Sequence, residues 1–138
     1  MKEQGKRVLE VEMPLRVGTY DIDYAGIVSN IVYLRWLEDL RTVILEDYLP
    51  LQDQIDQGLT PVLVSTEIHY LRAIRLFDKP IGRMWISDVG RARWSLQGEI
   101  SVDGRPMARA RHVLASVTLD TFRPRPLSPR LRELFESG

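Results

Sequence analysis

The residues best suited to take part in a chemical reaction lie in the first third of the chain. Asp21 and Asp23 stand in a short loop that also holds Gly26, and a long helix is predicted to begin at about Ser29 or Asn30, both favourable N-cap types. The first backbone N–H groups of a helix have no partner inside it and carry partial positive charge. A carboxylate beside such a helix end can act as nucleophile or base, while the N–H groups stabilise negative charge developing on a substrate oxygen.

The helix that follows this loop is predicted to run from about Asn30 to Tyr48. Apolar residues recur there at intervals of three and four, at Ile31, Leu34, Leu37, Leu40, Ile44 and Tyr48. Val32, Trp36 and Val43 widen the apolar stripe to most of the circumference. Because a helix that is apolar on most sides is a buried helix, we expect this one at the centre of the fold.

The rest of the chain reads mainly as strands. One is predicted over about Val8 to Thr19, and after Pro61 the apolar residues recur every second position. Asp103-Gly104 is typical of a type I′ hairpin turn. The remaining expected elements are a helical turn at 51–57, strands at 62–70, 81–89, 91–102 and 107–119, and a final helix at 129–135. Since helix and strands do not alternate, the sequence predicts an α+β fold with an antiparallel sheet curved around one helix.

Composition narrows the possible functions. At 138 residues the chain is expected to form a single domain, 1–138, and it has no cysteine, so thiol nucleophiles and disulfides are excluded. It has only two histidines and no apolar run of the ~20 residues needed to cross a bilayer. We therefore expect a cytoplasmic protein without membrane insertion. The net charge of zero argues against nucleic acid as a partner.

Several motifs resemble one known family. The stretch Asp21-Ile22-Asp23-Tyr24-Ala25-Gly26-Ile27-Val28 is followed by Asn30, Tyr33, Trp36, Glu38 and Arg41. This pattern resembles the hotdog-fold acyl-CoA thioesterases of the 4-hydroxybenzoyl-CoA thioesterase family, which includes the Tol-Pal-associated thioesterases. The resemblance continues through the segments 67–72, 103–105 and 123–127, so it covers most of the chain.

The resemblance implies a hotdog fold, a homodimer or homotetramer with active sites at the dimer interface, and hydrolysis of an acyl-CoA thioester. It places the catalytic carboxylate on Asp23 and the backbone N–H that polarises the thioester carbonyl on Asn30. Tyr24, Gly26 and Ile27, in the same loop, are the expected substrate contacts. No metal or organic cofactor is expected.

Each of these assignments has a structural alternative. Asp23 could order its loop as an Asx-turn or cap, and Asn30 could be a plain N-cap. Tyr24 and Tyr33 could line an acyl pocket or belong to the core. Whether Asp23 attacks the carbonyl directly or deprotonates water stays open at this level.

Residues outside the loop offer further possibilities. Arg91 and Arg93 are predicted on one face of a strand, at a spacing that suits the phosphates of coenzyme A or, equally, a solvated face. Glu38 and Arg41 have the i,i+3 spacing of a structural ion pair. Glu67 is a second carboxylate that could reach a site from a neighbouring subunit, and both histidines are expected to be structural. A non-catalytic acyl-CoA-binding hotdog protein is the main alternative to an enzyme.

Overall fold

The structure is a computed structural model that describes residues 7–137. Its elements, in chain order, are β1 (Val8–Pro14), the 3-10 turn η1 (Thr19–Asp21), α1 (Asn30–Tyr48), α2 (Leu51–Asp56), β2 (Leu59–Tyr70), β3 (Ile81–Val89), β4 (Arg93–Val102), β5 (Arg105–Thr118) and α3 (Pro129–Ser137). The predicted long helix is thus confirmed from its first residue to its last.

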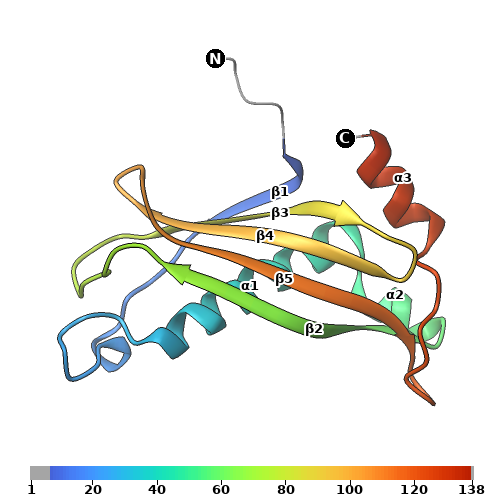
Figure 1. Cartoon of the computed structure of the whole chain (residues 1–138), viewed down its shortest axis with the longest axis horizontal. Helices are drawn as coiled ribbons and strands as arrows, with labels where there is room; N and C mark the ends of the chain where they lie inside the picture. The colour runs from blue at the N-terminus through green and yellow to red at the C-terminus, as the bar shows by residue number, and fades with distance from the viewer. Residues whose placement is uncertain (1–6, 138) are drawn as a thin grey trace.

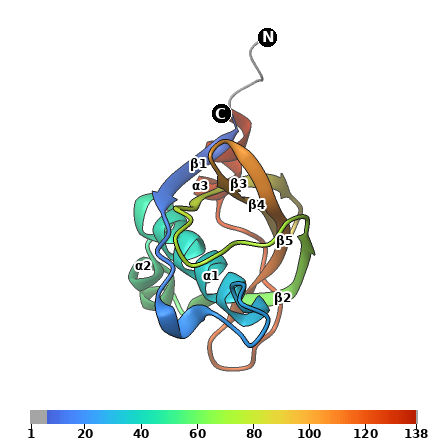
Figure 2. The ribbon, with the colours of Figure 1, turned by 90° about the vertical axis from the view of Figure 1, so that its left-hand side faces the viewer.

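The five strands form one antiparallel sheet with the order β1-β3-β4-β5-β2. The sheet curves around α1, which runs along its concave side (Figure 1). Seen end-on, the helix lies inside an arc of strands (Figure 2). The loop before α1 lies near the open side of this arc. The fold is therefore the α+β hotdog fold that the sequence predicts.

Two glycines let the helix approach the sheet. A Cβ atom on Gly82 of β3 would lie 2.9 Å from Leu40 Cδ1, and one on Gly98 of β4 would lie 3.1 Å from Leu37 Cδ2. Both leucines are fully buried, with Ile44 one turn further along α1. The closely packed core therefore depends on the missing side chains at these two sheet positions.

The expectation that the apolar stripe of α1 is buried is wrong at the N-terminal end of the helix. Ile31 is 70% exposed and Leu34 is 45% exposed. The helix lies closest to β3 and β1, and its buried side chains share a core cluster with Leu96 of β4 and Leu114 of β5. The helical spacing placed both residues on the apolar stripe of α1 but could not show that this part of the stripe is solvent-exposed.

Two strands also differ from the sequence-based bounds. β1 ends at Pro14, and the chain then passes through Leu15, whose N–H donates to Pro80 O, into η1 instead of continuing to Thr19. In β2 the pairing register with β5 shifts between Leu63 and Ser65, which leaves Val64 as the extra residue of a bulge. The Asp103-Gly104 turn has φ values of 52° and 76°, which confirms the type I′ prediction.

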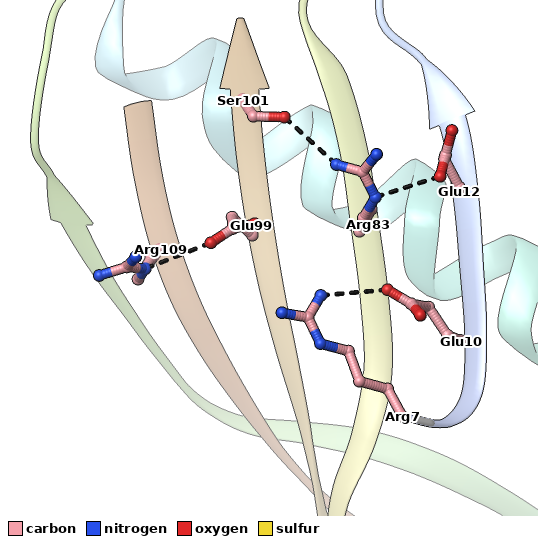
Figure 3. Close-up of polar contacts among 7 residues, drawn as sticks. All are labelled: Arg7, Glu10, Glu12, Arg83, Glu99, Ser101 and Arg109. Carbon is pink, nitrogen blue, oxygen red and sulfur yellow. Dashed lines mark hydrogen bonds and ion pairs between the residues drawn. The ribbon is translucent and has the colours of Figure 1, made fainter. Parts of the chain in front are cut away.

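The convex face of the sheet is polar and internally paired (Figure 3). Arg83 donates to Glu12 at 3.1 Å and to Ser101 at 3.3 Å, and Arg109 donates to Glu99 at 3.3 Å. These pairs join neighbouring strands across the sheet, which is the usual arrangement of cross-strand stabilisation. Within residues 7–137, no helix has the length and apolar character that crossing a membrane would require.

Candidate active site

The loop between β1 and α1 is built around Asp21. Its side chain is buried; Oδ2 accepts a hydrogen bond from Gly18 N at 2.8 Å, and Oδ1 accepts one from Arg35 at 3.0 Å. Its carbonyl accepts the N–H of Ser29 at 2.9 Å, which ties the loop to the start of α1. Asp21 therefore holds the loop in place through its side chain and its carbonyl.

Asp23 lies at the turn of this loop and is only partly buried. Its Oδ1 accepts the N–H of Ala25 at 2.8 Å, its N–H donates to Ile27 O at 2.9 Å, and its carbonyl accepts from Gly26 N at 3.0 Å. Gly26 has a φ of 80°, which this tight turn requires. The side chain thus forms the Asx-turn considered above, while Oδ2 has no hydrogen bond with any described residue.

The backbone amide of Asn30 begins α1 and is available as a donor. Ser29 is the N-cap residue, and its side chain makes no capping hydrogen bond. Within the part of the chain that the structure describes, the N–H of Asn30 donates to no acceptor, whereas the N–H of Val32 donates to Ser29 O at 3.0 Å. The loop therefore holds a carboxylate seven residues before an unsatisfied N–H at the positive end of a 19-residue helix.

Aromatic and apolar side chains surround this helix end. Tyr24 is fully exposed, whereas Tyr33 is buried and packs edge-on against Trp36, with ring centroids 5.5 Å apart, and against Tyr70 at 5.0 Å. Burial raises the pKa of both Tyr33 and Tyr70, so both phenols stay neutral at pH 7. The contact of Tyr70, at the end of β2, with the start of α1 could not be predicted from the sequence. No local pattern links Tyr70 to a helix that starts forty residues earlier.

Arg91 and Arg93 lie at the end of the sheet opposite the Asp23 loop. β4 begins at Arg93, and Arg91 stands in the bend before it, where its carbonyl accepts the N–H of Leu127 at 2.8 Å. This bend is next to α3, whereas Asp23 lies in the loop before α1 and Asn30 begins α1, at the other end of the molecule (Figure 1). The expectation that both arginines share a strand face is wrong for Arg91. Within one chain, neither arginine lies near Asp23.

The other titratable candidates contact neighbours within this chain. Arg41 lies 3.6 Å from Glu38, as the i,i+3 spacing predicts, and its guanidinium donates to His112 Nδ1 at 3.1 Å. Burial, with a smaller contribution from Arg41, lowers the pKa of His112 to about 4, so this imidazole is neutral at pH 7. Glu67 is exposed on β2 and lies 3.4 Å from His69. Among residues 7–137 no cluster of three histidine or acidic side chains could hold a metal ion.

Comparison with known families agrees with this architecture. A model of the thioesterase-like superfamily matches residues 17–135, which is most of the chain. The chain belongs to the thioesterase-like superfamily. The matched range takes in the Asp23 loop, α1 and all of the sheet except β1, so membership rests on the same elements that form the candidate site. The Tol-Pal-associated subgroup remains a prediction.

This superfamily member also resembles individual proteins, namely several solved structures and one protein matched by sequence. A DHNA-CoA thioesterase from Staphylococcus aureus superposes with a TM-score of 0.83 at 20% identity, over 93% of this chain and 89% of that one. A Thermus thermophilus thioesterase complexed with coenzyme A and Zn superposes at 0.79 with 24% identity, over 96% and 95% of the two chains. At such identities the likeness establishes the fold.

The Synechocystis protein named "Putative esterase sll0410" is 30% identical over 90 residues, which is 64% of this chain. The matched region spans about half of that relative, 54% of its length.

Proposed function

We propose that this superfamily member hydrolyses acyl-CoA thioesters, with Asp23 as the reacting carboxylate and the N–H of Asn30 as the oxyanion donor. The observation that carries the proposal is that a partly exposed carboxylate, held in a short hydrogen-bonded loop, comes seven residues before an unsatisfied N–H at the start of α1. Thioester hydrolysis needs these two groups and no more: one to deliver an oxygen nucleophile and one to hold the charge that moves onto the carbonyl oxygen.

Two routes use this pair. In the first, Asp23 Oδ2 attacks the thioester carbon, the C–S bond breaks with release of the coenzyme A thiolate, and water then hydrolyses the mixed anhydride. In the second, Asp23 takes a proton from a water whose oxygen attacks the same carbon. The C–S bond of the tetrahedral intermediate then breaks, and the departing coenzyme A thiolate takes up the proton. In both, the Asn30 N–H would donate to the carbonyl oxygen, an interaction worth roughly 3–4 kcal/mol in comparable sites.

The assembly that the resemblance implies also fits the open side of this chain. β2 is an edge strand of the sheet, and Leu63 and Val64 in its middle are 41% and 43% exposed. Ile31 and Leu34 are exposed on α1. Long apolar edge strands invite pairing, and we propose a homodimer, or a tetramer of such dimers, in which two β2 edges meet. Acyl-CoA is the proposed substrate; the Thermus structure bound to coenzyme A supports it.

The test is release of free thiol from a panel of acyl-CoA esters, compared with two matched variants. Asp23→Asn keeps the size and the Ala25 hydrogen bond but removes the charge, and we expect turnover to fall by about a thousandfold or more. Asp103→Asn changes an exposed aspartate in a type I′ turn that accepts asparagine equally well, so turnover should be unchanged.

Near-normal turnover in Asp23→Asn would remove this residue from its catalytic role. Binding of acyl-CoA without thiol release by the unmodified chain would instead favour a non-catalytic binding protein.

A further inference from the structure

A cavity of about 180 Å³ lies at the end of the molecule opposite Asp23. It is lined by the end of α1, by α2, by the first residue of β2, by residues of β4 and β5, and by α3 with the segment that leads into it. Its walls include the buried side chains Leu49, Trp94, Leu127 and Leu131. A space of this volume is equivalent to about six water molecules of liquid, which suits one small molecule.

One polar group in the wall comes from the sheet, the hydroxyl of Ser116. Ser116 of β5 lines the cavity and is only 7% exposed. Its backbone N–H donates to Ala92 O and its carbonyl accepts from Arg125 N, whereas its hydroxyl has no hydrogen bond with any described residue and stays accessible from the cavity. An accessible hydroxyl can both donate to a ligand and accept from it. The cavity therefore offers a ligand this hydroxyl beside its apolar side chains, with further polar groups on Gln54, Gln57 and Ser128.

Charged side chains at the rim affect which ligand the cavity would prefer. Arg130, in the first turn of α3, lies at the rim and forms no ion pair within residues 7–137; Asp53 of α2 lies at the rim as well. The nine-residue helix α3 begins at this rim, where the N–H groups of Leu131 and Arg132 already donate to Ser128. The positive charge of Arg130 favours an anion near it and the Asp53 carboxylate disfavours one. An apolar body whose carboxylate points toward Arg130 therefore matches the walls, the hydroxyl and the rim.

We propose that this cavity binds a small monocarboxylic acid with an apolar body of about six carbon atoms, with an oxygen of the acid hydrogen-bonded to the Ser116 hydroxyl. This site is separate from Asp23 and does not require the proposed hydrolysis. Its ligand nevertheless belongs to the chemical class that acyl-CoA hydrolysis releases, so the site would let an accumulating acid bind away from the reacting groups.

The three tryptophans make the site observable, because each lies in a different place. Trp94 lines the cavity, Trp36 is buried with Tyr33 near the start of α1, and Trp85 lies on the outer face of the sheet beneath Arg7. In the full chain labelled with 5-fluorotryptophan, each should give its own ¹⁹F signal, assigned by single Trp→Phe substitutions. Titration with hexanoate should shift the Trp94 signal and leave the Trp36 and Trp85 signals in place.

Variants of Ser116 test the contact itself. Ser116→Ala should weaken hexanoate binding about tenfold, as expected for loss of a hydrogen bond to a charged group, and Ser116→Leu should fill the space and abolish it. Ser95→Ala is the matched control: Ser95 is equally buried, but its hydroxyl accepts from Arg111, outside the cavity, so binding should be unchanged.

Absence of a Trp94 shift at millimolar hexanoate, or an equal shift in Ser116→Leu, would overturn the proposal. A shift confined to Trp36 would also overturn it, because it would place the acid beside Asp23. Thiol release from acyl-CoA by the same preparation reports separately on the proposed hydrolysis.

Discussion

At the scale of single residues, the two aspartates of the loop show how burial assigns roles. Asp21 is fully enclosed, and both of its carboxylate oxygens are occupied by Gly18 N and Arg35. Asp23 keeps one oxygen without a protein partner. Loss of the Asp21 carboxylate should therefore affect folding, whereas loss of the Asp23 carboxylate should affect turnover.

His112 should make folding stability depend on pH. Its pKa is about 4 in the folded chain against 6.5 as the ordinary value. Between these values the unfolded chain binds more protons than the native chain, so the free energy of unfolding falls as the pH drops from 6.5 to 4. A shift of this size corresponds to about 3 kcal/mol.

Urea denaturation at pH 7 and pH 4.5 would measure this contribution. His112→Gln should flatten the decrease relative to the unmodified chain, whatever its effect on stability at pH 7. His69→Gln, a change at an exposed histidine, should leave the decrease intact. An identical pH slope in all three proteins would mean that His112 titrates normally.

Arg91 is the residue-scale prediction that depends on another subunit. If a partner brings its Arg91 to the Asp23 loop, Arg91→Ala should raise KM several-fold for coenzyme A esters but spare pantetheine esters, which lack the nucleotide phosphates. Steady-state kinetics on both ester types would decide. Equal effects on the two would argue against a nucleotide contact.

At the scale of elements, the packing of α1 on the sheet is set by Gly82 and Gly98. Gly82→Ala would place a Cβ 2.9 Å from Leu40 Cδ1 and 3.1 Å from Leu15 Cδ1. Overpacking of this kind typically destabilises a protein by about 1–3 kcal/mol, and we expect a comparable loss in urea denaturation. Ser87→Ala, on the outward side of the same strand, should have less than half that effect. A neutral Gly82→Ala would show that the helix can move away from the sheet.

At the scale of the whole molecule, the exposed edge and helix face predict self-association. Analytical ultracentrifugation should show a dimer or tetramer, and Val64→Lys, in the middle of the β2 edge, should yield monomers with little thiol release. Ile55→Lys, at an equally exposed apolar position on α2, should keep the assembly. A monomeric but fully active unmodified chain would show that the site is complete within one subunit.

Local patterns in the sequence determined much of this protein. The i,i+3/i+4 spacing defined α1 to the residue, the period of two located the strands, and Asp103-Gly104 defined the hairpin, because each depends on neighbours within a few positions. The loop motif likewise indicated the superfamily and the candidate pair Asp23 and Asn30.

Only the tertiary structure decided which surfaces meet. It placed Tyr70 against Tyr33, left Ile31 and Leu34 open, and separated Arg91 from Asp23 by the length of the sheet. It also enclosed Ser116 beside Trp94. These outcomes depend on contacts between segments distant in sequence, which the curvature and strand order of the sheet bring together and which no local periodicity encodes.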